Sequence, residues 1–492
     1  MLPKPEEGDK IVRSVSVDKV PTGINGLDEI ISGGLPKGGI VILAGNPGTG
    51  KTIFSACFLY YGAVNYGEKG VYVSFAESRE TFLKNMLSLG LDFEGLEKRG
   101  EFRFLDLVTA REEATPAIIE TILREISEFG AKRLVIDSFS AMAQAFKDTH
   151  EARVTLHTII SRVTRLLGCT IILVVEVPYG ENKMGLGIEE FVADGIIRLS
   201  KSELEGGRIF REVEILKMRG TLIQENHSVF TLKDGFKALP PFEAKIAAKP
   251  SRFGPRPDAD ECFSTGSQDL DRMLGGGYQK GSTALIEIVD PYISILQYHV
   301  LIYPTIWNFL AQGRGALIFP SAGIDYSLIL RRVKEVCLEE NEINNLLRIF
   351  IKDYAGIRSA PYIVACRGDS FLEDYAKYVE IERELRERTG RPILHFVGAD
   401  MLIDTYGLRE ALSAIRNHAA RVRERGDLYM ILLKPGHPRI SEVLGALAES
   451  HIKITRKYGC VIIYGVKPRT PLYALEMDVS KGYFMPKLTQ II

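Results

Sequence analysis

Paired cysteines are missing from this sequence, which excludes a zinc site or a disulfide framework as its organising feature. The six cysteines never occur at C-x-x-C spacing, and four of them lie in apolar stretches. We therefore expect small, buried hydrophobic side chains at these positions. The cysteines are Cys57, Cys169, Cys262, Cys337, Cys366 and Cys460.

Long apolar runs are missing as well. No uninterrupted apolar stretch approaches the roughly 20 residues that a membrane span needs. Residues 1–7 also lack the apolar core of a signal peptide. We expect a cytoplasmic protein without a membrane partner.

The sequence also lacks an excess of charge of either sign. The 62 lysines and arginines balance 63 aspartates and glutamates, so the formal net charge is -1. A neutral total gives no electrostatic reason to expect duplex binding, although a local basic groove is compatible with it. Nucleic acid is therefore not an expected partner.

An internal repeat is the first feature that the sequence does contain. A chain of 492 residues is too long for one core. The pattern of Thr, Gly, Leu, Asp, paired Gly, Lys and Gly in Thr22–Gly39 returns at a constant offset in Thr265–Ser282, which indicates a tandem duplication of a domain of roughly 240 residues. The proline-rich segment Lys249–Pro257 marks the connection. The expected parts are a first domain, a linker and a second domain over residues 1–245, 246–260 and 261–492.

A phosphate-binding loop lies in the first copy. Eight consecutive residues fit the pattern G-x-x-x-x-G-K-[ST] in full, after the apolar run Ile40–Ala44 and before the helical stretch Ile53–Gly62. Backbone N–H groups and the helix N-terminus of such a loop bind a polyphosphate, the lysine neutralises its oxygens, and the threonine hydroxyl can ligate Mg2+. The strand and helix on either side argue against a chance match. The predicted site for ATP and Mg2+ consists of Gly45, Asn46, Pro47, Gly48, Thr49, Gly50, Lys51 and Thr52.

Alternating strand-like and helical patterns indicate an α/β fold, with a mainly parallel sheet flanked by helices in each copy. Ligands of such sheets bind at the carboxyl ends of the strands, so the loop, Glu77, Asp137 and Glu176 should converge there. Later strands are expected as antiparallel additions near Gly195–Leu199, Glu212–Lys217 and Ser228–Leu232.

Two carboxylates follow apolar strands in the first copy. Asp137 ends the strand Arg133–Asp137 and would hold Mg2+ directly or through water, although a turn or cap role is the alternative. Glu77 follows the strand Val71–Phe75, where it could act as a base or orient an attacking water. The alternative for Glu77 is a cap on the helix that begins near Ser78.

Lys217 and Arg219 are two cations in an extended stretch. At positions i and i+2 of a strand both side chains point the same way, so both could reach one phosphate, and we expect that phosphate to belong to a neighbouring subunit. A solvated strand face is the alternative.

The second copy has lost these features. Ile288–Ile295 replaces the phosphate loop, without a glycine, with Ser294 in place of the lysine and with Asp290 placed to repel phosphate. Gly398 stands where the metal carboxylate would be, and Asp400 follows two residues later. We expect the fold to persist without ATP binding.

The first copy resembles the KaiC-like family of RecA-type P-loop ATPases. The resemblance rests on the motif at Thr22–Asp28, the phosphate loop, Val135–Ser138, Gly187–Asp194 and Lys217–Thr221. It implies two tandem RecA-like domains and a hexameric ring with ATP at subunit boundaries. It further implies catalytic roles for Lys51 and Glu77, and action of Lys217 and Arg219 on the γ-phosphate of the neighbour. The same resemblance places Ser88 near the adenine and Asp234 against the neighbour's nucleotide.

One position departs from the family pattern. Two adjacent glutamates usually follow the strand Gly70–Phe75 in the family, and here Ala76 replaces the first, so only Glu77 remains. We expect a slow ATPase that acts as a regulatory or signalling protein, similar to two-domain archaeal KaiC-like and GvpD-like regulators. Its second domain would support assembly or dock a protein partner. The alternative is a RecA- or RadB-like DNA-processing ATPase with Tyr179–Leu186 as a DNA loop, but the neutral charge and the absence of a basic or aromatic strand-binding segment argue against it.

Overall fold

The computed structural model describes residues 18–107, 115–140, 168–178, 193–223, 225–352 and 360–492, which form two compact units. The first unit comprises Met1–Glu203 and Phe210–Pro240, and the second comprises Leu204–Ile209 and Pro241–Ile492. Among the described residues, no helix combines the length and apolar character needed to cross a membrane.

The first unit is built on a sheet of nine described strands in the order β11-β10-β9-β8-β3-β7-β6-β4-β5. These strands are β3 (Ile40–Gly45), β4 (Gly70–Ser74), β5 (Phe102–Asp106), β6 (Arg133–Asp137), β7 (Thr170–Glu176), β8 (Gly195–Leu204), β9 (Arg208–Met218), β10 (His227–Thr231) and β11 (Lys237–Leu239). The short pair β1 (Lys19–Val20) and β2 (Leu35–Pro36) stands apart from it. The helices are α1 (Leu27–Ile30), α2 (Lys51–Tyr66), α3 (Arg79–Ser88), α4 (Phe93–Lys98) and α5 (Thr115–Phe129).

Helices cover both faces of this sheet, because its central strands are apolar on both sides. β3 and β6 are buried along their whole length, as parallel strands between two helical layers must be. On one face Phe54 of α2, Phe82 of α3 and Phe93 of α4 pack in one core, and on the other the α5 stripe that includes Ile122 packs in a second core. The predicted α/β class, with a mainly parallel sheet, is confirmed.

One predicted strand direction is wrong. Gly195–Leu199, expected as an antiparallel addition, belongs to β8 and pairs parallel with β3 from Val41↔Gly195 to Gly45↔Leu199. Antiparallel pairing joins β9 to β10 and β10 to β11. An apolar run does not reveal strand direction, because a parallel strand and a buried antiparallel strand share the same pattern.

The second unit repeats this topology. Its ten described strands follow the order β17-β16-β15-β18-β19-β14-β20-β21-β22-β23, which matches the first sheet with one added edge strand, β17. The strands are β14 (Ser282–Ile288), β15 (Ala316–Phe319), β16 (Leu347–Lys352), β17 (Ile363–Cys366), β18 (Leu394–Gly398), β19 (Leu428–Leu433), β20 (Ser450–Lys457), β21 (Cys460–Lys467), β22 (Leu472–Asp478) and β23 (Met485–Ile491). The short pair is β12 (Cys262–Phe263) and β13 (Tyr278–Gln279).

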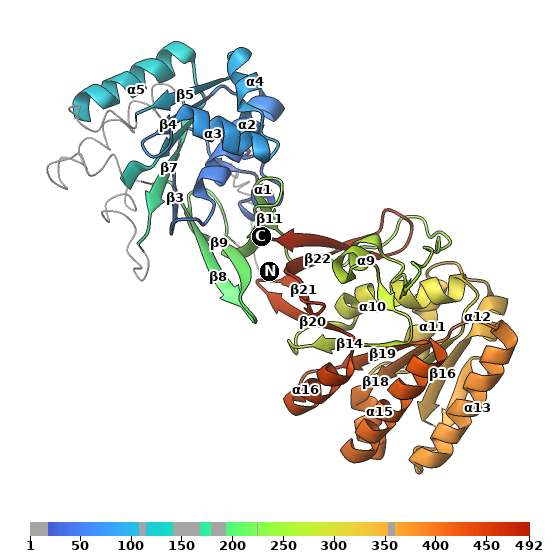
Figure 1. Cartoon of the computed structure of the whole chain (residues 1–492). Coiled ribbons are helices and arrows are strands. Elements are labelled where there is room, and N and C mark those ends of the chain that lie inside the picture. Colours follow the sequence, from blue (N-terminus) through green and yellow to red (C-terminus); the bar gives the residue numbers. More distant parts are fainter. Residues whose placement is uncertain (1–17, 108–114, 141–167, 179–192, 224, 353–359) are drawn as a thin grey trace, which may run out of the picture. The chain divides into compact units, whose positions relative to one another are not determined.

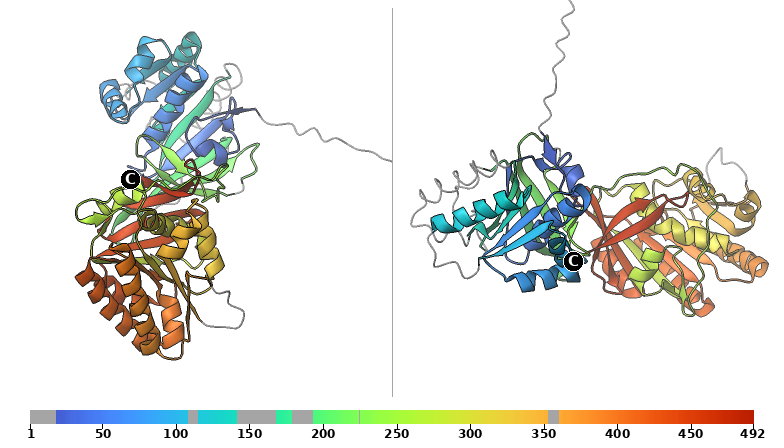
Figure 2. Two further views of the ribbon diagram at one scale, coloured as in Figure 1. Left: turned by 90° about the vertical axis from the view of Figure 1, so that its right-hand side faces the viewer. Right: turned by 90° about the horizontal axis from the view of Figure 1, so that it is seen from above.

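Helices again cover both faces of the second sheet. They are α9 (Gln268–Leu274), α10 (Ile295–Ala311), α11 (Tyr326–Lys334), α12 (Glu340–Leu346), α13 (Phe371–Thr389), α14 (Ala399–Tyr406), α15 (Leu408–Arg425) and α16 (Pro438–Leu447). Figure 1 shows α13, α15 and α16 on one face and α10, α11 and α12 on the other, and both views of Figure 2 show the same layering within the unit.

The repeat is preserved in local detail. In the first unit Thr22 donates to Asp28 from its backbone N (2.8 Å) and its hydroxyl (2.7 Å). In the second unit Thr265 donates to Asp271 in the same way, at 2.7 and 2.6 Å. A side-chain motif shared at this precision, together with the shared strand order, supports a duplicated domain.

The proline-rich segment packs as part of the second unit. The Phe242 backbone N donates to Gly459 O (2.9 Å), and the Phe253 backbone N donates to Val336 O (3.1 Å). Phe253 is buried in the core of this unit, against Trp307 and Tyr483. Residues 241–260 are therefore held by hydrogen bonds and by burial of an aromatic anchor.

Candidate nucleotide site

The phosphate loop of the first unit connects β3 to α2. Gly50 is the N-cap residue of α2 and has φ of 103°, a conformation that glycine adopts at no steric cost. Within the described chain, no side chain caps this helix. The first backbone N–H groups of α2 therefore lack a side-chain acceptor and can bind an anion.

Lys51 begins α2 and bends back over the loop. Its Nζ donates to Gly45 O (2.9 Å) and Asn46 O (3.0 Å), and its side chain is buried. Burial lowers the pKa of Lys51, while the nearby carboxylates of Glu176 and Asp137 act in the opposite direction. Within the described residues, the hydrogen bonds of this desolvated ammonium go to carbonyl oxygens, so it gains strongly from a bound polyanion.

Asp137 sits beside the helix N-terminus, as predicted from the end of β6. Its Oδ2 accepts hydrogen bonds from Thr52 Oγ1 (2.9 Å) and from the Tyr72 hydroxyl (2.5 Å). The part of the chain that the structure describes donates nothing to Oδ1. Thr52 and Asp137 thus place a hydroxyl and a carboxylate together, which is the donor set that suits Mg2+.

Tyr72 is a site residue that the sequence reasoning missed. Its ring is fully buried in β4, and burial together with the adjacent Asp137 carboxylate raises the pKa of the phenol well above its ordinary value. Tyr72 therefore remains a hydrogen-bond donor that fixes Asp137. A tyrosine inside an otherwise aliphatic strand was the only signal in the sequence, because the two residues lie 65 positions apart.

The expected convergence of strand ends is confirmed. Val177, the first residue after β7, donates from its backbone N to the O atom of Gly45 at the end of β3 (3.1 Å). Phe75, the first residue after β4, donates in the same way to Asp137 O at the end of β6 (2.7 Å). Asn46 Nδ2 also donates to Val177 O (2.8 Å), which holds the start of the loop against β7.

Glu77 lies at this same edge and does not cap α3. The N-cap is Ser78, whose side chain accepts from Thr81 N. The Glu77 carboxylate is half-buried and meets Asn85 Nδ2 only at 3.5 Å. Burial and the nearby Asp137 charge raise the pKa of Glu77 above its ordinary value, which increases its basicity.

Arg211 of β9 is a second residue missed from the sequence. Its buried guanidinium Nη1 donates to the loop carbonyls of Gly48 (3.3 Å) and Thr49 (3.2 Å), and lies over the Phe230 ring. Thr49 Oγ1 in turn donates to Asn46 O (2.8 Å). These contacts hold the loop carbonyls away from the position of a bound anion, and they leave the loop N–H groups available to bind it.

Lys217 and Arg219 do not reach the phosphate loop of their own chain. Arg219 donates to Asp194 Oδ1 (2.8 Å), and Asp194 Oδ2 accepts from Ile40 N (3.0 Å) at the start of β3. The loop begins after the other end of β3, roughly 17 Å away at about 3.4 Å per residue. β9 ends at Met218, so Lys217 belongs to the strand while Arg219 lies in the turn that follows it.

Ser88 and Asp234 occupy exposed positions. Ser88 is the last residue of α3, and its hydroxyl donates to Asn85 O (2.7 Å). Asp234 lies in the turn between β10 and β11, with φ of 57° and its carboxylate 3.9 Å from Lys237 Nζ. Leu232, two residues earlier, lies against Gly50, so this turn adjoins the phosphate loop. Pro47 lies in the loop itself.

Two sequence predictions fall outside the described residues. The proposed DNA loop Tyr179–Leu186 is one of them. The other is most of the Gly187–Asp194 motif, of which the structure describes Ala193 and Asp194.

In the second unit the corresponding helix N-terminus is already capped. Ser294 accepts from Gln297 N, and Gln297 Oε1 accepts from Ser294 N (2.8 Å), so the two residues form a capping box on α10. Asp290 accepts from Tyr292 N (2.8 Å) in the preceding turn. The N–H groups that would meet a phosphate are thus partly satisfied, and a carboxylate stands in the loop.

The second unit has no equivalent of the Asp137 carboxylate of the first unit. A Cβ added at Gly398 would lie 2.3 Å from Ser321 Cα, so no side chain fits there. Asp400 instead accepts from the Ser321 hydroxyl (2.7 Å) and from Ala322 N (3.1 Å), with Lys434 Nζ at 3.6 Å. Asp400 is committed to these structural contacts.

A phosphate loop, a strand-end carboxylate and a parallel sheet with this strand order define a RecA-like P-loop ATPase domain. Residues 20–238 match the family model described as "ATPase: KaiC". This match identifies the first unit as a KaiC-like domain of the RecA-type P-loop ATPases.

Named relatives agree with this family. The chain is 33% identical over 291 residues to the circadian clock oscillator protein KaiC of Thermostichus vulcanus, which covers 58% of this chain and 54% of the relative. It is 34% identical over 280 residues to KaiC of Acaryochloris marina, covering 55% and 52%. The chain thus spans about half the length of these curated relatives. A crystal structure of a KaiC-like protein from Pyrococcus horikoshii is 37% identical, with 46% of this chain and all of that chain covered and a TM-score of 0.41.

Proposed function

We propose that the first unit binds ATP with Mg2+ and hydrolyses it slowly, and that the protein acts as a nucleotide-dependent regulator. The observation that carries this proposal is the uncapped N-terminus of α2 with the buried amine of Lys51 held beside it. The second unit provides an internal contrast, because its equivalent helix is closed by Ser294.

The residues of the first unit fit a metal-bound nucleotide. Thr52 and Asp137 would hold Mg2+, which when bound neutralises phosphate charge. The loop N–H groups and Lys51 bind and orient the phosphates. Tyr72 keeps the Asp137 carboxylate in place by donating to Oδ2.

Glu77 is the proposed water-orienting base. It lies at the carboxyl edge of β4, close enough to Asp137 for that charge to raise its pKa. Its weak contact with Asn85 leaves the carboxylate free to accept a proton from water. Ala76 offers no second carboxylate, which supports slow turnover.

The position of Lys217 and Arg219 supports the proposal that a neighbouring subunit completes the site. Both lie at the sheet edge opposite the loop of their own chain, and Arg219 is exposed. In a head-to-tail ring, which we propose to be hexameric, that edge of one subunit can face the loop of the next. Asp234 and Ser88 would then border the nucleotide, and the second unit would serve assembly or the docking of a protein partner.

We do not extend the circadian role in the relatives' names to this chain. The chain covers about half of those proteins, and its second unit lacks the residues to bind a phosphate. No feature of the described residues favours the DNA-processing alternative.

The first experiment measures Mg-ATP binding, turnover and native mass in one sample. Lys51→Ala should abolish binding, while the exposed Lys98→Ala, as a matched control, should leave it unchanged. Glu77→Gln should keep binding and abolish turnover, whereas the nearby exposed Glu80→Gln should retain both. A chain that binds no ATP would refute the proposed site, and binding with an unaffected Glu77→Gln turnover would refute the base.

The second experiment tests the contribution of the neighbour. Lys51→Ala and Arg219→Ala chains should each be inactive, and mixing them should restore about a quarter of the wild-type turnover, since one interface in four pairs an intact loop with an intact arginine. A mass that stays monomeric with and without Mg-ATP would contradict the oligomer. Failure of the mixture to regain activity would contradict action across subunits.

A further inference from the structure

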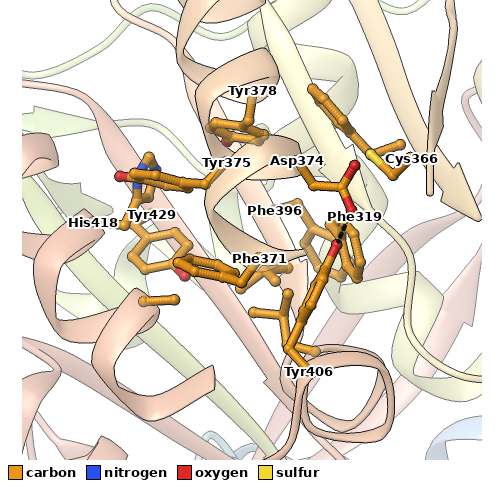
Figure 3. A pocket seen from close by; sticks show the side chains of 14 residues that line it. Phe319, Cys366, Phe371, Asp374, Tyr375, Tyr378, Phe396, Tyr406, His418 and Tyr429 are labelled. Carbon is orange, nitrogen blue, oxygen red and sulfur yellow. Dashed lines mark hydrogen bonds between the residues drawn. The ribbon is translucent and has the colours of Figure 1, made fainter. Parts of the chain in front are cut away.

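The second unit contains an aromatic cavity that its lost phosphate loop does not explain. The cavity has a volume of about 60 Å³ and lies where α13, α14 and α15 meet the sheet. Figure 3 shows rings from these three helices and from the strands surrounding it, including Phe371, Tyr375, Tyr406 and Tyr429. All of its lining residues belong to the second unit.

The rings form a continuous set. Phe371 lies 5.3 Å from Tyr375 and 5.4 Å from Tyr406 between ring centroids, and Tyr378 lies 4.7 Å from Phe350. The faces of aromatic rings carry negative charge density from their π electrons, so they attract a cation within about 6 Å of the ring centroid. No lysine or arginine in the described parts of the chain lies over these particular rings.

A carboxylate lies in the cavity wall without a basic partner. Asp374 accepts from Arg367 N (3.1 Å), Gly368 N (2.8 Å) and the Tyr406 hydroxyl (2.9 Å). Backbone and phenol donors orient this carboxylate but do not neutralise it. Among the residues that the structure describes, none forms an ion pair with Asp374.

The opposite end of the cavity adds no compensating cation. Burial and the neighbouring His395 and Arg421 lower the pKa of His418 well below its ordinary value, so its imidazole is neutral at physiological pH. Arg421 and Arg425, which lie behind it, both donate to Glu382. The lining therefore combines π faces, one carboxylate and no positive charge.

The buried cluster behind the cavity is not the better candidate. Glu382, His395 and Asp427 lie close enough together to share a metal ion. However, Arg386 pairs with both carboxylates, and Arg421 and Arg425 also pair with Glu382. These arginines already supply the positive charge that a metal would bring.

We propose that this cavity binds the methylated ammonium group of a small organic cation. A buried water occupies about 10–15 Å³ of cavity volume, so this cavity holds roughly four to six heavy atoms. That is the size of a trimethylammonium group. Aromatic rings and one carboxylate are the recognition chemistry for such a group. All of the residues that would hold this cation belong to the second unit, so the proposed site uses no residue of the nucleotide site in the first unit.

Calorimetric titration of the full chain with choline and with 3,3-dimethyl-1-butanol tests this assignment. The alcohol has the same shape with carbon in place of the charged nitrogen. Choline should bind at least tenfold more tightly than the alcohol. Equal binding of both would overturn the cation specificity, and binding of neither would overturn the site.

Variants locate the binding and separate it from folding. Asp374→Asn and Tyr375→Leu should each weaken choline binding at least tenfold, while Tyr375→Phe, which keeps the ring, and Leu372→Ala, whose side chain is exposed, should not. Unfolding followed by Trp307 fluorescence reports whether each variant keeps the second unit intact. Folded Asp374→Asn and Tyr375→Leu proteins with unchanged affinity would refute the proposal. Lys51→Ala should leave choline binding unchanged, so failure of the nucleotide proposal would be recognised separately.

Discussion

Removing the Tyr72 hydroxyl tests how the Asp137 carboxylate is held. The Tyr72 ring packs against Phe82 and Phe104, with centroid distances of 4.5 and 5.5 Å. The ring of Tyr72→Phe keeps these contacts, so no cavity opens. The loss is one hydrogen bond of 2.5 Å to a buried carboxylate. Hydrogen bonds to charged groups contribute about 1.5–3 kcal/mol, and we expect the free energy of unfolding of the first unit to fall by about that amount.

The single tryptophan gives this experiment an internal reference. Trp307 is fully buried in α10, so its fluorescence follows the second unit, while far-UV circular dichroism follows both. In urea titrations without nucleotide, the dichroism transition assigned to the first unit should move to lower urea, and the fluorescence transition should not.

Tyr60→Phe is the matched control. Its ring packs on Phe93 of the same unit, and its hydroxyl has no hydrogen-bond partner among the described residues. This variant should change the free energy of unfolding by less than about 0.5 kcal/mol. A Tyr72→Phe effect no larger than that of Tyr60→Phe would refute the view that the phenol fixes Asp137.

Three other perturbations probe the same framework. The pKa of Glu77 is raised and its deprotonated carboxylate is the active form, so the measured turnover should fall as the pH is lowered, with a midpoint above the ordinary 4.5. A midpoint at or below 4.5 would contradict this role. Arg211→Met removes the brace on the loop carbonyls and should weaken ATP binding by about 1.5 kcal/mol, roughly tenfold in Kd by titration; unchanged affinity would contradict the brace. Gly398→Ala forces a methyl group onto the Ser321 backbone and should destabilise the second unit by about 1–3 kcal/mol in Trp307 fluorescence melts, whereas Gly254→Ala, whose methyl meets open space, should be near neutral.

Much of the nucleotide site was predictable because its signals are local in the sequence. The loop from Gly45 to Thr52 and the strand ending at Asp137 each specify their own backbone, and the parallel sheet brings their ends together. The structure excludes the alternative that Glu77 caps α3, since Ser78 rather than Glu77 accepts from Thr81 N.

The remaining parts depend on tertiary contacts that leave no local pattern. Tyr72 and Arg211 meet the site from strands 65 and 163 residues away from their partners. The parallel direction of β8 depends on the path of the intervening chain rather than on its apolar pattern. Residues from many helices and strands line the cavity in the second unit, so no single stretch of the sequence predicts it.

The close approach of Ser321 to Gly398 also bears on the history of the duplicated domain. Restoring a carboxylate at position 398 would collide with the backbone of the neighbouring strand's connection, and restoring a lysine at Ser294 would remove the cap of α10. Each reversion alone carries a folding penalty and brings no catalytic gain until the other changes are in place. The packing of the second unit therefore opposes the return of a phosphate site, whatever ligand this unit itself binds.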